Sequence, residues 1–352
     1  MLDNIKSKYI LSAIFECMRN KKKLNIIKYN KKIKERIEIT KEDYKAYKSL
    51  KQFNKKFNLN IKDIDIKTLN FDGRYLDAKK LAYLSKGKFK ELKKLNLSDN
   101  FLSDISILEK VNFNELNILH LTSNQITNIN PLENVNFTKL KKLVLSCNRI
   151  SDLSVFEKVN FNELKILDLK RNEITDISVL ENVNFKKLKK LVLGSNKISD
   201  ISILEKTNFK ELKELDLSSN EISDINILEK VNFKKLKKLF LDFNKISDIN
   251  ILERVDFKEL NGIYLLLNKI SDISVLEKVN FKELKVLQLE GNRITDISIL
   301  EKSNFQKLKY LDLEHNRISN INILEKVNFK KLEELNLSRN RISDINVLEK
   351  VN

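Results

Sequence analysis

The chain has 352 residues, of which 41% are hydrophobic, and its formal net charge is +18. This apolar content is enough for a core, but no run reaches the roughly 18 apolar residues of a membrane-spanning helix, so we expect no transmembrane segment. The sequence holds only two cysteines, Cys17 and Cys147, which excludes a disulfide-rich secreted domain and favours the cytoplasm.

The positive charge is concentrated near the N-terminus. Residues 1–60 carry 17 Lys and Arg against 6 Asp and Glu, and the rest of the chain adds only +7. A basic segment of this kind predicts an acidic partner, nucleic acid or an anionic membrane. An A/T-rich genome, whose codons favour Lys, Asn and Ile, explains the same composition without a partner. No RGG tract or stacking-aromatic motif is present, so we do not expect nucleic acid.

Residues 1–62 do not repeat and are predicted to form a basic helical module. An apolar stripe at helical spacing marks its first helix. The stripe consists of Ile10, Leu11, Ile14, Phe15 and Met18. In a third predicted helix, Phe53 and Phe57 share one face. The module is interpreted as a cap for the repeats that follow, because a solenoid needs an atypical terminal unit.

A second interpretation treats the same module as a docking segment. The hydrophobic spacing of residues 5–37 resembles that of an F-box, in which one helix is followed by a second. An F-box ahead of a repeat array is typical of substrate receptors of ubiquitin ligases. The resemblance therefore implies that the apolar stripe of the first helix docks an adaptor.

Residues 63–88 are predicted to be a degenerate capping repeat. Ile66, Leu69 and Phe71 occupy the positions of the strand leucines of later units, and Arg74 replaces a recurring asparagine. The stretch 77–86 is more helical in character than any later unit.

Residues 89–352 consist of eleven units of 24 residues, without insertion or deletion. Each unit opens with a phenylalanine and carries an asparagine eleven positions later, as Phe185 and Asn196 illustrate. Leu191 and Leu193 in this unit alternate as in a β-strand with one buried face. The apolar residues that follow lie three apart, at Ile198, Ile201 and Leu204, which favours a 3₁₀-like return. A strict period of this length specifies a solenoid.

The pattern L-x-x-L-x-L-x-x-N-x-I resembles the leucine-rich repeat family over all eleven units. The run NKISDISIL at 196–204 is most similar to the subclass of bacterial internalins and SDS22-like phosphatase regulators. The resemblance implies an α/β solenoid, a right-handed arc with a parallel β-sheet on the concave face and irregular or 3₁₀ turns on the convex face. The stacked asparagines should satisfy backbone groups as a ladder, since each amide both donates and accepts.

No arrangement of residues predicts catalysis, a cofactor or a metal site. The two histidines, His120 and His315, lie eight units apart and cannot share a site. The aspartate that recurs in nine of the eleven units, such as Asp200, is expected to bond locally to the convex turn. One carboxylate per turn does not form a calcium site. We therefore expect a non-enzymatic protein.

Binding is expected on the concave face, where strand residues between the buried leucines vary. Large apolar residues are densest there in the seventh and eighth units, and one valine on either side extends the group. We call the whole set the concave patch, and it comprises Val192, Phe240, Phe243, Tyr264, Leu266, Leu267 and Val286. Exposed apolar clusters mark interaction sites. Random substitution on an unselected surface, or partial burial of Phe243 and Leu267 at the strand end, would explain the same residues without a partner.

A basic strip follows the ladder asparagines in the last five units. It comprises Lys245, Lys269, Arg293, Arg317 and Arg341. The strip would favour an acidic protein partner. At the C-terminal end, residues 329–352 are expected to be the least protected unit, or to self-associate weakly.

The function predicted from these patterns is a cytoplasmic scaffold for protein–protein interaction. The alternatives are a substrate receptor of a ubiquitin ligase, and an electrostatic binder of nucleic acid or anionic membrane through residues 1–60.

Overall fold

The computed structural model describes residues 52–57, 66–76, 78–86 and 89–350. The first predicted helix, with Ile10, Leu11, Ile14, Phe15 and Met18, lies outside these residues, as does most of the basic module. Among the described residues, no helix is long and apolar enough to cross a membrane.

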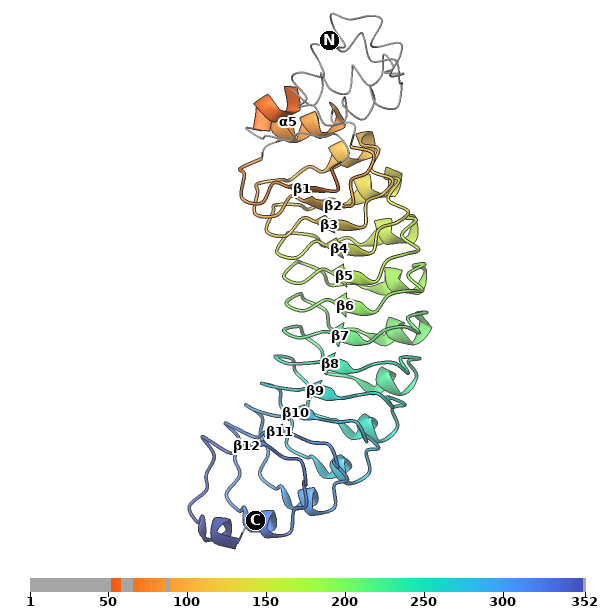
Figure 1. The fold of residues 1–352 in the computed structure, drawn as a ribbon. Helices are drawn as coiled ribbons and strands as arrows, with labels where there is room; N and C mark the ends of the chain where they lie inside the picture. The colour runs from red at the N-terminus through yellow and green to blue at the C-terminus, as the bar shows by residue number, and fades with distance from the viewer. Residues whose placement is uncertain (1–51, 58–65, 77, 87–88, 351–352) are drawn as a thin grey trace, which may run out of the picture.

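One parallel sheet of twelve strands runs through the chain in sequence order, so the predicted continuous solenoid is confirmed (Figure 1). Each strand has three residues. The strands are β1 (Thr68–Asn70), β2 (Lys94–Asn96), β3 (Ile118–His120), β4 (Lys142–Val144), β5 (Ile166–Asp168), β6 (Lys190–Val192), β7 (Glu214–Asp216), β8 (Lys238–Phe240), β9 (Gly262–Tyr264), β10 (Val286–Gln288), β11 (Tyr310–Asp312) and β12 (Glu334–Asn336). Equivalent residues of neighbouring units pair, as Leu191 pairs with Leu215.

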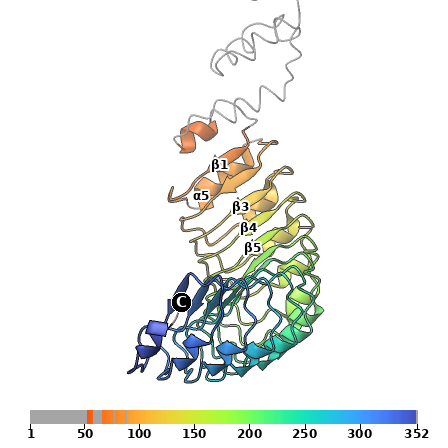
Figure 2. The same ribbon diagram turned by 60° about the horizontal axis from the view of Figure 1, so that its bottom comes forward.

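Short 3₁₀ helices form the opposite side of each unit, as the three-residue spacing of apolar side chains predicts (Figure 2). They are η3 (Ser106–Lys110), η4 (Asn130–Asn134), η5 (Ser154–Glu157), η6 (Ser178–Glu181), η7 (Ser202–Lys206), η8 (Asn226–Glu229), η9 (Asn250–Glu253), η10 (Ser274–Glu277), η11 (Ser298–Glu301), η12 (Asn322–Glu325) and η13 (Asn346–Lys350). The recurring aspartate starts each turn: Asp248 Oδ1 accepts the backbone N–H of Asn250 at 2.8 Å. This is the local role expected for that carboxylate.

The asparagine ladder joins each unit to the one before it. The side-chain amide of Asn244 donates to the carbonyl oxygens of Leu217, Leu241 and Asp242 at 3.0–3.1 Å. Its Oδ1 accepts the N–H of Ile222 at 3.0 Å. Both the carbonyl of Leu217 and the N–H of Ile222 belong to the preceding unit, so one side chain satisfies buried backbone groups on both sides of the unit boundary.

The core is a stack of leucines and isoleucines closed by the recurring phenylalanines. Leu239, Leu241 and Ile246 are fully buried in the seventh unit, and Phe233, which opens that unit, is 1% exposed. Burial of such a ring stabilises the fold by about 1.5–3 kcal/mol. Because no unit encloses its own apolar face, each depends on its neighbours.

The N-terminal end of the repeats is covered by residues outside the 24-residue pattern. β1 pairs with β2, and α5 (Ala78–Leu81) leads directly into η2 (Ala82–Lys86). Phe53 is buried, with its ring centroid 4.9 Å from that of Phe89 and 6.0 Å from that of Phe71. Phe57 lies 4.9 Å from Phe71. Residues 52–57 therefore pack against the end of the solenoid, with Phe53 in its core and Phe57 beside it.

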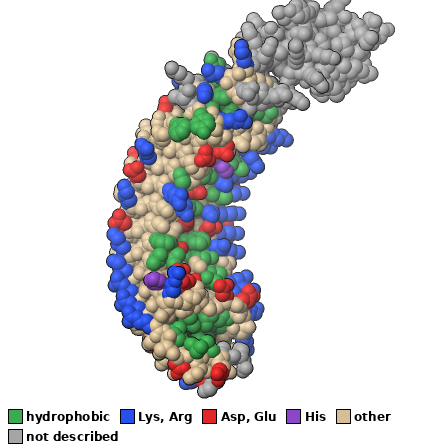
Figure 3. Space-filling model, turned by 90° about the vertical axis from the view of Figure 1, so that its left-hand side faces the viewer, with side chains coloured by type: hydrophobic (Ala, Val, Ile, Leu, Met, Phe, Trp, Pro, Cys, Tyr) green, Lys and Arg blue, Asp and Glu red, His purple; other side chains and the backbone are tan. Residues whose placement is uncertain are grey.

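The last unit is less buried than the others. Leu332, Leu335 and Leu337 are only partly buried, whereas their counterparts in the preceding units are buried. Ile345 is 62% exposed. Figure 3 shows apolar side chains gathered at this end of the arc.

Replacing a ladder asparagine should destabilise the fold strongly. Asn244→Ala would leave the N–H of Ile222 without its partner and would remove one of the two amide donors that Leu217 and Leu241 each accept. We expect this to lower the free energy of unfolding by about 2 kcal/mol. Urea unfolding followed by circular dichroism measures this. Asn250→Ala, which changes an exposed side chain on the convex turn, serves as control and should cost less than about 0.5 kcal/mol. Equal losses for the two variants would show that the ladder is not a special support.

Candidate functional site

The strands present their first and third residues to the concave face and bury the middle one. In β8 the middle residue, Leu239, is fully buried, Lys238 is exposed and Phe240 is partly buried. Leu265, in the next unit, is also buried. The expected strand phase therefore holds, and the variable residues at first and third positions form columns across the sheet.

An aromatic pair forms the centre of the concave patch. The rings of Phe240 and Tyr264 are stacked, with centroids 4.3 Å apart and an interplanar angle of 14°. Both residues are half-buried rather than fully exposed, because each covers one face of the other. The parts of the two rings that stay accessible form an apolar surface on the strands of two units.

Gly262 makes room for this pair, and the sequence analysis missed it. A Cβ atom on Gly262 would lie 2.9 Å from Cε2 of Tyr264, so the tyrosine ring lies against the backbone of the first residue of β9. Every other unit of the array has a side chain at this position. The signal was therefore present in the sequence as a single glycine two residues before a tyrosine.

Phe243 and Leu267 are the exposed part of the concave patch, at 48% and 43% of their surface. Both precede a ladder asparagine and have positive φ values, 54° and 52°. The side chain of Leu267 leans towards the next unit, where a Cβ on Gly291 would come within 2.5 Å of Leu267 Cδ2. About half of each residue is covered, so partial burial at the strand end stays an explanation of these two residues beside partner binding. Apolar side chains gather in this part of the arc in Figure 3.

The ends of the concave patch differ from expectation. Val192 is only 5% exposed, so the expectation that it extends the accessible patch is wrong. Its short side chain lies between Asp168 and Asp216 of the neighbouring strands, which pair with it in register. Val286 and Leu266 are partly buried. The accessible patch is thus narrower than the sequence suggested.

A buried carboxyl group borders the patch. Asp242 Oδ1 accepts the backbone N–H of Leu266 at 2.9 Å. Burial, with a further contribution from the charge of Asp216, raises the pKa of Asp242 to about 6. Burial also raises the pKa of Tyr264, and the negative charges of Asp242 and Glu214 raise it further. Near neutral pH the patch therefore combines an aromatic platform with a carboxylate that is poorly solvated.

The basic strip is exposed along its whole length. Lys245, Lys269, Arg293, Arg317 and Arg341 all lie at the surface, at the start of the return path. Each is placed by the same backbone bond, as Lys245 N–H donates to the carbonyl of Ile222 at 2.8 Å. Lys245 also forms an ion pair with Glu221 at 2.9 Å.

The structure brings together two further groups that the sequence analysis did not connect. Tyr75 and Phe101, both largely exposed, stack with centroids 5.9 Å apart near the N-terminal end of the sheet. Glu290, Asp312 and Glu314 place carboxylate oxygens within 4.8 Å of one another. Asp312 is held inside the fold, since its oxygens accept the hydroxyl of Tyr310 and the N–H of Glu314.

The two histidines and the described cysteine do not form a reactive group. His120 lies on β3, and its Nε2 is buried without a hydrogen-bond partner. Burial is the main cause of its lowered pKa. His315 precedes a ladder asparagine eight units along the array, and Cys147 is a free, partly buried thiol.

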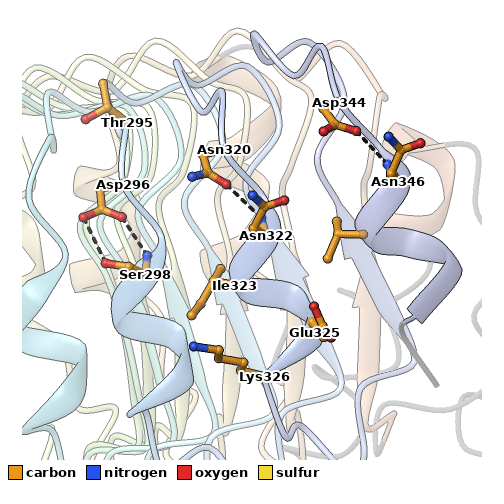
Figure 4. A pocket seen from close by; sticks show the side chains of 11 residues that line it. Thr295, Asp296, Ser298, Asn320, Asn322, Ile323, Glu325, Lys326, Asp344 and Asn346 are labelled. Atoms are coloured by element: carbon orange, nitrogen blue, oxygen red, sulfur yellow. Dashed lines mark hydrogen bonds between the residues drawn. The ribbon is translucent and has the colours of Figure 1, made fainter.

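A cavity of about 580 Å³ lies between the convex turns of the last units (Figure 4). Its polar groups serve the turns themselves: Asp296, Asn320 and Asp344 each accept the backbone N–H two residues further on. The cavity is therefore a gap between repeated turns, and its polar groups do not converge on a ligand.

The pH dependence of stability should report the burial of Asp242. Because burial raises the pKa of Asp242 in the folded state, its protonated carboxyl favours folding and its ionised form disfavours folding. The free energy of unfolding should therefore fall as pH rises from about 4 through 6. We expect Asp242→Asn to be more stable than the parent by about 2 kcal/mol at pH 7.5, with no gain at pH 4. Thermal or urea unfolding at both pH values measures the difference.

The matched control is Asp248→Asn, at a column where Asn320 already accepts the same bond in another unit. It should show no pH-dependent gain. A gain from Asp242→Asn that is equal at pH 4 and pH 7.5 would contradict the assignment.

Comparison with known proteins identifies the repeat. A leucine-rich repeat model spanning two copies matches residues 186–230, 210–254 and 306–350, and a second leucine-rich repeat model matches residues 138–198. No curated protein matches the sequence of the chain.

Solved structures share the fold. An internalin, InlF, from Listeria monocytogenes is 27% identical, with a TM-score of 0.66, over 86% of this chain and 93% of that one. A leucine-rich repeat protein of Leptospira interrogans is 20% identical, with a TM-score of 0.52, over 86% and 97%. The plant peptide hormone receptor RGFR1, solved in complex with RGF2, is 22% identical, with a TM-score of 0.55, over 74% of this chain and 41% of the receptor.

Proposed function

The chain belongs to the leucine-rich repeat family, and on that premise we propose that it is a non-enzymatic scaffold that binds a partner protein on its concave face. The stacked pair of Phe240 and Tyr264 is the observation that carries the proposal. Half-buried aromatic rings with one open side are typical anchors of protein interfaces.

The surroundings of the pair support a protein partner. Phe243 and Leu267 extend the apolar area to the strand end, where both are exposed. Beyond them, Lys245 and Lys269 provide charge at the rim. An apolar centre with a charged rim is the usual anatomy of an interface, and the positive rim favours acidic groups on the partner.

Truncating the aromatic pair should weaken partner binding. We expect Phe240→Ala or Tyr264→Ala to cost about 2 kcal/mol of binding free energy, roughly a 30-fold loss of affinity. Because both rings are half-buried, a smaller loss of stability, about 1 kcal/mol, should accompany it. The partner is captured from the native host with the full chain, identified by mass spectrometry and titrated by calorimetry.

Ile345→Ala is the matched control, since Ile345 is an exposed apolar residue far along the array from the pair. It should leave the affinity unchanged. If both pair variants fold and retain full affinity, the partner does not use the concave patch.

The two alternative functions rest on residues outside the described part of the chain. Adaptor docking through Ile10, Leu11, Ile14, Phe15 and Met18, and electrostatic binding through residues 1–60, stay predictions. Deletion tests them, and the deletion should end before residue 52, because Phe53 belongs to the core. Loss of ubiquitin-ligase components would support the first alternative. Loss of nucleic acid with a steep salt dependence would support the second. The cytoplasmic location is likewise a proposal, based on the cysteine count, and cell fractionation tests it.

Self-association through residues 329–352 also stays a proposal. In the 352-residue chain, the partly exposed Leu332, Leu335 and Leu337 should make this unit exchange amide hydrogens faster than the units around Leu215. Hydrogen exchange at high and low protein concentration measures this, and protection that falls on dilution would indicate a dimer. Protection equal to that of the central units in a proven monomer would contradict both forms of the proposal.

A further inference from the structure

A row of lysines runs along the side of the sheet on which the chain enters the strands. One lysine precedes each of β4, β5, β6, β7 and β8, and we call these five residues the lysine row. They are Lys141, Lys165, Lys189, Lys213 and Lys237. From Lys165 onwards, the backbone N–H of each lysine donates to the carbonyl oxygen of the previous one at 2.8 Å. Their backbones are therefore held at the strand separation, about 4.8 Å.

The charges of the lysine row are poorly compensated. Among the described residues, Lys141, Lys165, Lys189 and Lys213 form no ion pair, and Lys237 reaches Glu259 at 3.4 Å. The nearby carboxylates are shared with other lysines. Glu163 is bound by Lys187 and Glu211 by Lys235, at 2.5 and 2.6 Å, and these contacts are the main cause of the lowered pKa of both glutamates. The charges of the lysine row lower these pKa values further without forming an ion pair to either glutamate.

On the convex side of the same units, acidic and basic side chains are paired with each other. There a glutamate of one unit pairs with a basic residue of the next, as Glu229 does with Arg254 at 2.9 Å and Glu181 with Lys206 at 3.2 Å. Like charges stacked in register destabilise a sheet, so an uncompensated column is costly unless a partner neutralises it. Lysines are concentrated in the residues around the start of the strand: segments 186–190 and 234–238 both read KKLKK.

A shallow groove follows the lysine row. One part, of about 390 Å³, is lined by residues from Lys165 to Asn261, and a second part, of about 410 Å³, by residues from Lys93 to Ile166. Lys165 and Ile166 line both parts, so the groove is continuous. Ile118 and Ile166 are partly buried in it, and Lys165, Lys189, Lys213 and Lys237 are also partly buried. Lysines in this state cover the groove with their aliphatic stems and keep their ammonium groups at its rim. Basic side chains follow the inner curve of the arc in Figure 3.

We propose that the lysine row binds an acidic, amphipathic α-helix of a partner protein, laid along the groove. Carboxylates on one face of the helix meet the ammonium groups, and apolar side chains beside them contact Ile118, Ile166 and the lysine stems. The lysine row starts four units before the aromatic pair and ends at Lys237, at the opposite end of β8 from Phe240. The row and the pair use different side chains, so each can be substituted separately.

Spacing favours a helix over an extended peptide. An α-helix advances about 5.4 Å per turn and places one side chain per turn on a given face. Across the four intervals of the lysine row this amounts to about 22 Å, against about 19 Å for the lysine backbones, a difference that flexible lysine side chains absorb. An extended strand repeats on one face every ~6.7 Å, which gives about 27 Å.

Other polyanions fit less well. Proteins that bind single-stranded nucleic acid combine a basic groove with aromatic rings for the bases, and no aromatic residue lines this groove. A flat anionic bilayer cannot reach a row of lysines that follows an inward curve.

The test uses the full chain and two fluorescein-labelled peptides of about 20 residues, long enough for about 30 Å of helix. One peptide carries a glutamate and a leucine on the same face in every turn. The other has the same composition with the glutamates distributed around the helix. Fluorescence anisotropy should show that the first binds at least about tenfold more tightly, with an affinity that falls as salt rises.

The variant pair Lys189→Glu with Lys213→Glu should weaken binding of the first peptide by at least about tenfold. Lys186→Glu with Lys210→Glu is the matched control, because it makes the same charge change at exposed lysines of the same units outside the groove lining. It should change the affinity by less than about threefold. A third pair, Lys189→Met with Lys213→Met, keeps the apolar stems. It should lower the affinity while keeping or raising the melting temperature, because repulsion within the lysine row is relieved.

Three outcomes would overturn the proposal. Equal affinity for the two peptides would mean that the groove does not distinguish a helix with one acidic face from a helix whose glutamates are distributed. Equal losses of affinity for the groove variant pair and the control variant pair would mean that binding depends only on the net charge of the protein. Tighter binding of a labelled oligothymidine with the same dependence on Lys189 and Lys213 would assign the surface to nucleic acid. None of these results depends on Phe240 or Tyr264, so failure here leaves the concave patch proposal intact.

Discussion

The asparagine ladder is the contact on which the rest of the solenoid depends. Where the chain leaves each strand, it turns sharply and would bury backbone groups without partners. The side chain of Asn220 bonds to the carbonyl of Leu193 in the preceding unit and to those of Leu217 and Ser218 in its own. Its Oδ1 accepts the N–H of Ile198. A shorter or longer side chain would not reach the backbone of both units, and a side chain that only donates or only accepts would leave some of these groups unsatisfied. This explains why asparagine recurs at one spacing.

The ladder also determines which residues are displayed. The residue before each asparagine adopts a left-handed backbone conformation, with φ between 52° and 56° in ten units and 68° at Gly291. Asn and Gly tolerate this region best, yet Phe243 and Leu267 occupy it and remain exposed. The turn thus holds two large apolar side chains at the edge of the concave face, where the fold gains little from burying them.

With the backbone fixed in this way, the surface columns carry the differences between units. The convex column is internally neutralised by ion pairs between successive units, such as Glu205 with Lys230. The sheet side carries both an aromatic pair and a line of lysines, of which only Lys237 forms an ion pair among the described residues. Exposed ion pairs contribute little to the stability of the fold. The difference in charge pairing between the two sides should therefore affect partner binding more than folding. A scaffold of this kind can engage one partner with two chemically different surfaces.

The sequence alone determined the fold, because its signals are local and repeated. Leucine spacing set the strand phase, Asn196 and its equivalents marked the turn, and the isoleucines three apart indicated the 3₁₀ return. The sequence also located the aromatic residues of the seventh and eighth units. Only the tertiary structure decided their exposure. Val192 is buried, Phe240 and Tyr264 cover each other over Gly262, and burial perturbs Asp242, because accessibility depends on side chains 24 residues away that stack alongside. The lysine row was likewise present in the sequence, but its meaning required knowing which glutamates were already engaged. Pairing across units is a property of the stacked array, and no single unit contains it.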